Sequence, residues 1–253
     1  MRFRHEVKFL ADIAMVDEFF KELEPFCDFD KHSGATNSYE IASVYYDTAD
    51  LRFYLDREES VGYRRKIRLR TYNVEEQAQA LFIEIKEKHK RLVAKKRINM
   101  KSMDILNMGI PHDELPLDMV ISELEDSAEA REMAYLHDRL NLYPVALIRY
   151  IRKALIPKTE FDMRITFDTK ITSGGNFLNK FDPDLEKYLC QPGQGVLEVK
   201  TNKNIPIWMQ SILRKYPFKH TQFSKYCLGV DAIYGTDRPW MAFAENKLSS
   251  YVA

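Results

Sequence analysis

Positively charged residues recur at every second position in several short segments of this 253-residue chain. The densest run lies in residues 61–72, where Lys66, Arg68 and Arg70 alternate with apolar residues. Alternation of this kind predicts a β-strand with one charged face and one apolar face. A single such strand needs no special function, because the polar face of a half-buried strand normally faces water. The recurrence of the pattern on other predicted strands is what suggests a site.

The predicted charged faces carry far more cations than acids. A surface that only keeps a protein soluble mixes the two signs more evenly, and crowded like charges cost free energy unless a polyanion occupies the space. Only four acids share these faces, namely Glu6, Glu84, Asp168 and Glu198. The cations that share them are Lys8, Lys66, Arg68, Arg70, Lys86, Lys95, Arg97, Arg152, Arg164 and Lys200.

These residue types suit phosphate chemistry. The planar guanidinium group of arginine binds phosphate oxygens in pairs, and lysine supplies a compact positive charge. The few carboxylates are the ligands that a hard divalent cation such as Mg²⁺ or Mn²⁺ prefers. The chain has no glycine-rich phosphate loop, so a nucleotide would be held by side chains and not by the N-terminus of a helix.

Composition limits the function classes. Lysine plus arginine and aspartate plus glutamate both number 38, so no overall basic charge predicts a nucleic-acid or membrane partner. The three cysteines, Cys27, Cys190 and Cys227, are odd in number and widely spaced, which predicts reduced thiols in a cytoplasmic protein. No apolar run reaches the length of a membrane span, and the six histidines lack metal-ligand spacing.

The pattern along the chain predicts an α+β fold dominated by strands. We expect strands over residues 2–10, 41–46, 61–72, 81–88, 92–100, 145–156, 161–171 and 193–200, and helices over 13–26, 117–141, 206–215 and 222–234, with a short helical turn at 48–54. If the helices cover the apolar faces, the charged faces turn towards one another and antiparallel strands can close into a barrel with a polar lumen. The alternative is an open sheet with its charged face in water. We predict one domain over residues 1–253, with a core of about 2–235 and a C-terminal tail at 236–253.

Several motifs, in this order and spacing, resemble one known family. The chain resembles the VTC domain, which is the polyphosphate polymerase domain of the vacuolar transporter chaperone complex and of its bacterial relatives. That domain belongs to the triphosphate tunnel metalloenzymes, so the resemblance implies an antiparallel eight-stranded β-barrel tunnel with helices packed outside. The resemblance covers about residues 2–235. The motifs are Arg4-x-Glu6-x-Lys8-Phe9, Tyr45-Tyr46-Asp47-Thr48, Arg68-Leu69-Arg70, Ile83-Glu84-Ile85-Lys86, Leu197-Glu198-Val199-Lys200 and Phe223-Ser224-Lys225-Tyr226.

The resemblance implies an activity and a set of site residues. The family polymerase transfers the γ-phosphate of ATP to a growing polyphosphate chain with Mn²⁺ or Mg²⁺, so ATP and polyphosphate are the expected partners. The implied catalytic residues, which would hold the transferred phosphoryl group, are Arg68, Arg70, Lys86 and Arg164. The implied substrate-binding residues are Lys8, Arg57, Lys95, Arg152, Lys200 and Lys225, and the implied metal ligand is Glu198. Arg57 and Lys225 depend on the resemblance alone.

The chemistry needs no general base, because the acceptor is a phosphate oxyanion that is already deprotonated near neutral pH. Alignment and charge neutralisation therefore carry the catalysis. Hydrolytic tunnel enzymes usually begin with Glu-x-Glu-x-Lys, and Arg4 replaces the first of these acids here, which favours transfer over hydrolysis. Glu6 and Glu84 either assist the metal or pair with neighbouring cations, and we favour pairing.

Three other functions compete with the polymerase. A non-catalytic sensor or carrier of polyphosphate would keep the cations without needing Glu198. A tri- or polyphosphatase would use the same scaffold and release orthophosphate. Nucleic-acid binding ranks last, because it requires cations interleaved with stacking aromatics on an outer groove. The chain has no predicted transmembrane segment. The sequence does not indicate whether the protein has a membrane-bound partner.

Overall fold

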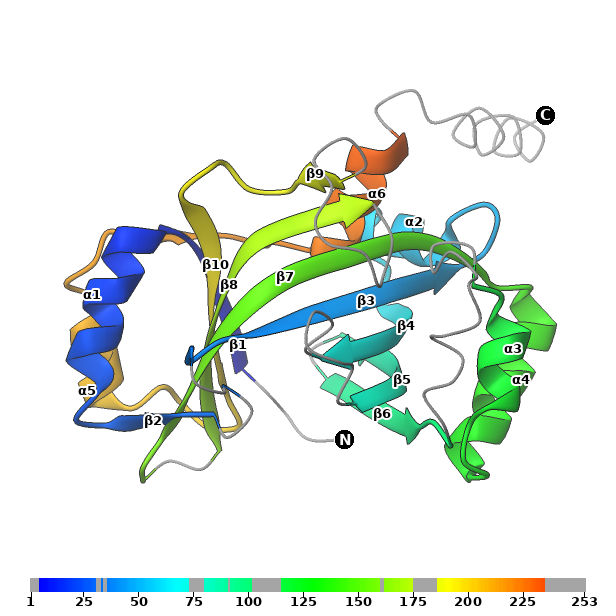
Figure 1. The fold of residues 1–253 in the computed structure, drawn as a ribbon, viewed down its shortest axis with the longest axis horizontal. Coiled ribbons are helices and arrows are strands. Elements are labelled where there is room, and N and C mark those ends of the chain that lie inside the picture. Colours follow the sequence, from blue (N-terminus) through cyan, green and yellow to red (C-terminus); the bar gives the residue numbers. More distant parts are fainter. Residues whose placement is uncertain are drawn as a thin grey trace.

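A single large antiparallel β-sheet forms the centre of the fold (Figure 1). The computed structural model describes residues 5–30, 33, 36–72, 80–90, 92–101, 115–159, 162–174 and 186–234. Arg4 and the predicted tail at 236–253 lie outside the described residues. The predicted α+β fold dominated by antiparallel strands is confirmed.

Eight long strands make up most of the sheet. They are β1 (His5–Asp12), β3 (Tyr39–Asp47), β4 (Tyr63–Tyr72), β5 (Ala80–His89), β6 (Leu92–Asn99), β7 (Tyr143–Pro157), β8 (Met163–Gly174) and β10 (Gln194–Thr201). The structure also has three short strands that were not predicted, namely β2 (Cys27–Phe29), β9 (Glu186–Tyr188) and β11 (Lys219–His220). The order is β11-β1-β10-β8-β7-β3-β4-β5-β6, with β2 beside β7 and β9 beside β8.

Closure of the sheet into a complete barrel stays a prediction. The edge strands β6 and β11 do not pair with each other within the described residues. The structure therefore supports a large antiparallel sheet, and the tunnel itself remains to be tested.

The helices lie at three places around this sheet. They are α1 (Ile13–Leu23), α2 (Arg52–Glu58), α3 (Leu117–Ser122), α4 (Ala128–Leu140), α5 (Ile207–Leu213) and α6 (Lys225–Tyr234). In Figure 1, α1 and α5 lie together on one side, α3 and α4 lie on the opposite side, and α2 and α6 lie along a third side. No helix in the described part of the chain is long and apolar enough to cross a bilayer.

Two predicted helices differ from the structure. The single helix expected over residues 117–141 is two helices, because Leu124 forms a β-bridge with Met100 and the Ser127 side chain caps α4 by accepting the N–H of Ala130 at 3.0 Å. The helical turn expected at 48–54 begins only at Arg52. This start is fixed by the Asp47 carboxylate, which accepts the backbone N–H groups that open α2.

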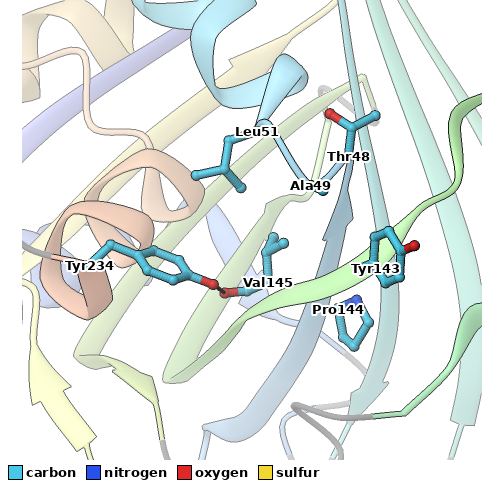
Figure 2. A pocket seen from close by; sticks show the side chains of 7 residues that line it. All are labelled: Thr48, Ala49, Leu51, Tyr143, Pro144, Val145 and Tyr234. Atoms are coloured by element: carbon cyan, nitrogen blue, oxygen red, sulfur yellow. Dashed lines mark hydrogen bonds between the residues drawn. The ribbon is translucent and has the colours of Figure 1, made fainter. Parts of the chain in front are cut away.

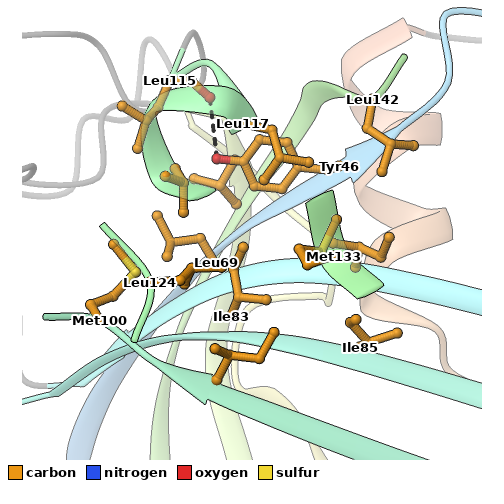
Figure 3. Packing of buried hydrophobic residues seen from close by; sticks show 14 of the residues in the cluster. Tyr46, Leu69, Ile83, Ile85, Met100, Leu115, Leu117, Leu124, Met133 and Leu142 are labelled. Carbon is orange, nitrogen blue, oxygen red and sulfur yellow. Dashed lines mark hydrogen bonds between the residues drawn. The ribbon is translucent and has the colours of Figure 1, made fainter. Parts of the chain in front are cut away.

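Two apolar clusters cover the outer face of the sheet, as predicted. In the first, Leu69, Ile83 and Ile85 from the strands pack against Leu117 of α3 and Met133 of α4 (Figure 3). In the second, α1 and α5 pack against β1, β8 and β10. Because apolar residues alternate with charged ones along these strands, covering the apolar face turns the charged residues to the opposite, inner face.

A third cluster shows that the inner face is only partly charged. Tyr45 and Ile148 on the inner face pack against Tyr54 of α2 and against Tyr226 and Val230 of α6. The prediction that all helices pack outside the sheet is therefore wrong for α2 and α6. The two helices cover one part of the inner face, and the charged side chains occupy the remainder.

Candidate functional site

Glu84 on β5 is the centre of the largest group of charges. It is 1% exposed and accepts the Arg68 guanidinium at 2.6 and 2.9 Å and the Arg97 guanidinium at 3.1 Å. The Lys95 ammonium also contacts it, and Arg70 approaches to 3.7 Å. Four cations therefore surround one buried carboxylate, so the group carries a net positive charge. The preferred prediction that Glu84 pairs with cations is confirmed.

Asp168 on β8 is the centre of a second group. The Arg152 guanidinium donates to both oxygens of Asp168, at 2.6 and 2.7 Å, and the Lys225 ammonium donates at 2.6 Å. Arg152 comes from the neighbouring strand β7, and Lys225 comes from the first turn of α6. Burial opposes ionisation of Asp168, but the two cations hold the pKa of its carboxyl well below its usual range.

Lys8, Glu6 and Glu198 form a third group across β1 and β10. The Lys8 ammonium lies 3.1 Å from Glu6 and 3.3 Å from Glu198, and Lys200 lies 2.7 Å from the other oxygen of Glu198. Glu6 also lies 3.7 Å from Lys86 of β5. Burial raises the pKa of Glu198, but the neighbouring Lys200 and Lys8 outweigh burial and hold this pKa well below its usual range.

Tyrosine hydroxyls orient three of the arginines. Arg68 donates to the Tyr45 hydroxyl at 2.8 Å and Arg70 donates to the Tyr150 hydroxyl at 3.0 Å. In the same way, Arg164 donates to the Tyr39 hydroxyl at 2.8 Å. The tyrosines Tyr39 and Tyr45 come from β3, and Tyr150 comes from β7. This role of the tyrosines was not predicted, although Tyr39 and Tyr45 share the inward parity of their strand.

The segment 222–226 brings several of these charges together. The Phe223 carbonyl accepts a hydrogen bond from Lys8 at 3.0 Å, and the Ser224 hydroxyl accepts one from Lys66 at 2.9 Å. The Gln222 side chain accepts a hydrogen bond from Arg57 of α2 at 3.5 Å. This short segment thus connects residues of β1, β4 and α2 that are far apart in the sequence.

Uncompensated charge is visible in the lysine pKa values. Withdrawal from water lowers the pKa of Lys86 to about 8, and repulsion by Lys200 and Lys8 adds to this effect. Withdrawal from water also lowers the pKa of Lys95 to about 7, because burial outweighs the attraction of Glu84, and Arg68 and Arg70 repel the charged form as well. A polyanion bound at this face would relieve both penalties.

The donor set near Glu198 suits a hard divalent cation. Glu198 and Glu6 are joined by their shared contact with Lys8. Opposite Glu198 in the sheet register lies Thr166, whose buried hydroxyl has no hydrogen-bond partner among the described residues. All three side chains offer oxygen atoms, the ligand type that Mg²⁺ and Mn²⁺ take. Among the described residues, no three histidine, cysteine or acidic side chains lie close enough together to hold a metal ion by themselves. Phosphate oxygens would therefore have to complete the coordination.

The structure brings together most of the predicted site residues. Arg68, Arg70 and Lys95 meet at Glu84, while Arg152 and Lys225 meet at Asp168. Lys8, Lys86 and Lys200 meet around Glu6 and Glu198.

Two predicted site residues stand apart from these groups. Arg164 contacts the buried carboxylate of Asp30, which follows the short strand β2 and was not predicted to be near it. Arg57 lies on α2 and contacts Gln222 and, at 3.9 Å, Glu58. Lys66 and Arg97, which were predicted to face inward, contact Ser224 and Glu84 respectively.

A pocket of about 260 Å³ lies between the loop before α2, the start of β7 and the end of α6 (Figure 2). It is lined by Thr48, Ala49, Leu51, Tyr143, Pro144, Val145 and Tyr234. No charged side chain lines this pocket, so it has no means of holding a phosphate chain. The candidate site is therefore the charged part of the inner face.

Comparison with known proteins gives one family match. The model of the VTC domain matches residues 3–234. No curated protein matches the chain. Among solved structures, a putative adenylate cyclase from Bacillus halodurans aligns with a TM-score of 0.49 and 12% identity, covering 88% of this chain and 94% of that one. The Schizosaccharomyces pombe Mediator head module aligns with a TM-score of 0.35 and 12% identity, covering 84% of this chain and 88% of that one.

Proposed function

Because the chain belongs to the VTC domain family, we propose that it is a polyphosphate polymerase that transfers the γ-phosphate of ATP to inorganic polyphosphate. The observation that carries this proposal is the positive charge of the inner face. There Glu84, Asp168 and Glu198 are each bound by two or more cations, and each is almost fully buried. Arg70 and Arg152 are buried, whereas Arg68, Lys95, Arg97, Lys8 and Lys200 remain partly exposed and can reach an anion.

The side chains of the site can carry the transfer by positioning and charge. Arg68 and Arg70 are held by Glu84 and by tyrosine hydroxyls, so their guanidinium groups are oriented before a substrate arrives. Preorganised donors of this kind stabilise developing charge without reorganisation during the reaction. The acceptor phosphate supplies its own oxyanion, so no side chain has to remove a proton.

A divalent cation fits this proposal. Glu198 and Glu6, with the Thr166 hydroxyl nearby, would hold Mn²⁺ or Mg²⁺. When bound, such an ion neutralises phosphate oxygens and helps to orient them. The protein's own residues Lys8 and Lys200, which contact Glu198, would then be displaced towards the phosphates and would add positive charge there.

We also infer that the eight long strands enclose a tunnel. Glu6 of β1 and Lys86 of β5 approach to 3.7 Å although five strands separate β1 from β5 in the sheet order. The segment 222–226 likewise accepts hydrogen bonds from Lys8 of β1 and Lys66 of β4. A sheet must curve strongly to bring such distant strands together, and strong curvature favours an enclosed site.

One observation favours a second candidate, a non-catalytic polyphosphate sensor. Both oxygens of Glu198 contact lysines, Lys8 on one side and Lys200 on the other. A glutamate that serves only to hold these lysines would not need a metal. For both candidates we propose a cytoplasmic setting, because three widely spaced cysteines are typical of a protein with reduced thiols.

Incubation of the purified protein with ATP and Mn²⁺, with analysis of the products, tests the proposal. The polymerase yields ADP and long-chain polyphosphate in step with each other. Orthophosphate without chain growth would identify a phosphatase instead. Tight polyphosphate binding with no turnover under any divalent metal would identify the sensor and overturn the polymerase.

A further inference from the structure

Three cross-strand pairs of like charge lie next to one another on the inner face of strands β4, β5 and β6. Arg64 is directly opposite Lys88, Lys66 is opposite Lys86, and Lys86 is opposite Lys95. Like charges directly opposite each other in a sheet are destabilising. The fold therefore keeps an arrangement that costs stability.

Elsewhere on the same strands the charges are matched. One step further along the inner face, Arg68 is opposite Glu84, and Glu84 is in turn opposite Arg97. On the outer face, Arg65 is opposite Glu87 and forms an ion pair with it at 3.0 Å. The unmatched pairs are thus confined to the inner face, at the end nearest the hairpin that joins β5 to β6.

Three cations of this end, Arg64, Lys66 and Lys88, lack an acidic partner among the described residues. Within the described part of the chain, no carboxylate lies within ion-pair distance of Arg64, Lys66 or Lys88, whereas Lys86 has Glu6 at 3.7 Å. Arg64, Lys66 and Lys88 are half-buried, so their side chains cannot move apart freely into water. Burial lowers the pKa of Lys88, and repulsion from Arg64 adds to this, while a weaker attraction by Glu6 opposes both effects.

The position of these residues relates them to the proposed reaction centre. Arg64, Lys66 and Arg68 occupy successive inward positions of β4, so the row continues from the residues bound to Glu84. At about 3.3 Å per residue, Arg64 lies roughly 13 Å along the strand from Arg68. The row is continuous along β4, partly exposed and composed of one charge sign, as a linear polyanion requires.

We propose that Arg64, Lys66 and Lys88 form an extension of the site that binds inorganic polyphosphate beyond the phosphates held at the reaction centre. This inference rests on the proposed function, since it assumes that a phosphate chain occupies the inner face. It assigns a binding role to Arg64 and Lys88, and it gives the chain a direction, because the bound chain leaves the centre towards the β5–β6 hairpin. The extension is engaged only by chains long enough to reach it.

The test compares two ligands on the intact protein without turnover. In the double variant Arg64→Gln with Lys88→Gln, the affinity for long-chain polyphosphate is expected to fall roughly tenfold at moderate salt, while the affinity for tripolyphosphate stays within about twofold. By analogy with single-stranded nucleic acids, the slope of log affinity against log salt should decrease by about 1.4 for the long chain, at about 0.7 per lost cation.

A matched control removes the same charge elsewhere. Lys21→Gln with Arg139→Gln alters two exposed cations on the outer helices α1 and α4 and should leave both affinities unchanged. The Arg64/Lys88 variant should also unfold at a higher temperature than the parent without ligand, because it removes a like-charge pair. This second measurement shows that weaker binding does not come from misfolding.

The outcomes separate the extension from the proposed function. Loss of long-chain binding alone supports the extension, whether or not the protein turns over ATP. Equal loss for both ligands, or no loss for either, overturns it. If the parent binds neither ligand, the proposed function fails as well. If a single-stranded oligonucleotide displaces long-chain polyphosphate from the parent but not from the variant, the row binds nucleic acid and the proposal is wrong.

Discussion

Single hydrogen bonds decide how the arginines of the site are oriented. The Tyr45 hydroxyl accepts from Arg68, and its ring stacks on Tyr226 with centroids 4.9 Å apart. Tyr226 in turn donates to the Asp47 carboxylate, which also caps α2. This chain of contacts fixes the Tyr45 ring, and the fixed ring holds the Arg68 guanidinium. Tyr45 is therefore a positioning residue, while Arg68 would touch the substrate.

The first prediction compares two adjacent tyrosines. Tyr45→Phe should lower the rate of phosphoryl transfer roughly tenfold with little change in KM, because an ion–hydrogen bond worth about 1.5–3 kcal/mol no longer orients Arg68. Tyr46→Phe is the control, since Tyr46 is equally buried but points to the outer cluster and donates to the Leu115 carbonyl at 3.2 Å. Steady-state kinetics and thermal unfolding of both variants measure the difference. Equal rate losses would show a purely structural role.

The second prediction concerns Glu198. Glu198→Gln should reduce polymerisation by about 10²–10³, in line with the loss of one group that stabilises transition-state charge. Binding of polyphosphate should be unchanged or stronger, because Lys8 and Lys200 lose their acidic partner. Glu125→Gln, on the outer surface, serves as the charge control. Full activity of the Glu198 variant would remove Glu198 from the metal site.

The third prediction follows from the lowered pKa of Lys95. In the protein without ligand, the pKa of Lys95 is about 7. A bound polyphosphate favours the protonated form of Lys95 and raises this pKa. Binding above pH 7 must therefore take up a proton, and affinity should fall by up to about tenfold per pH unit as pH rises through 7–9. Calorimetry in buffers of different ionisation enthalpy measures the uptake. Lys95→Arg should make the profile less steep near pH 7, because arginine keeps its charge and Lys86, with a pKa of about 8, continues to titrate; an unchanged profile would contradict the assignment.

The alternating pattern predicted which side chains share a face but not which atoms they contact. Lys66, Arg68 and Arg70 lie on one face, as the parity of residues 61–72 indicated. The contact between Arg164 and Asp30 could not be predicted, because Asp30 follows a strand of three residues, which is too short to show an alternating pattern. Hydrogen bonds to tyrosines depend on strand register, which parity alone does not set.

Among the elements, α6 has the strongest effect on the site. Its first turn places Lys225 on Asp168, and Gly229 lies where the helix crosses β7 and β8. A Cβ atom added at Gly229 would collide with Ile148 and would come within 2.9 Å of the Ser173 hydroxyl. The absence of a side chain there allows the helix to lie close to the sheet.

The fourth prediction tests this close approach. Gly229→Ala should destabilise the protein by about 1–3 kcal/mol, because overpacking forces the helix or its neighbours to move. It should also weaken polyphosphate binding by shifting Lys225. Gly62→Ala is the matched control, since an added Cβ at Gly62 has no atom within 4 Å and should change stability by less than about 0.5 kcal/mol. Denaturant unfolding measures both, and equal stabilities would contradict the packing argument.

The position of α6 shows where prediction from the sequence ends at the scale of elements. Periodicity identified a helix near residues 222–234, and the structure begins it at Lys225. Periodicity did not reveal that the helix covers the inner face. That placement depends on Ile148 and Val196, apolar residues at inward positions, which only a partner from a distant segment can cover. The break between α3 and α4 was missed for a similar reason, because a bridge to Met100 causes it.

At the scale of the whole molecule, separation of charge matters more than net charge. The chain has 38 basic and 38 acidic residues, yet its inner face is positive. The sequence predicted this separation from the parity of several strands taken together. It did not predict the order of the strands or the curvature of the sheet, because these depend on contacts between segments far apart in the chain.

The fifth prediction uses this separation. Tripolyphosphate at about 100 times its dissociation constant should stabilise the protein by about 2.7 kcal/mol and raise Tm by roughly 5–10 °C. The shift should shrink as salt increases, since the interaction is screened and counterions are released. Sodium chloride at matched ionic strength is the control. A salt-independent shift, or no shift at any concentration, would show that the inner face is not an anion site.

The contact between Lys8 and Phe223 spans 215 positions of the sequence. During synthesis on the ribosome, Lys8 and Lys66 emerge long before segment 222–226 exists to accept their hydrogen bonds. Until translation has passed this segment, Lys8 and Lys66 lack these two acceptors. The contacts that join β1 and β4 through segment 222–226 therefore form only after this segment has been synthesised.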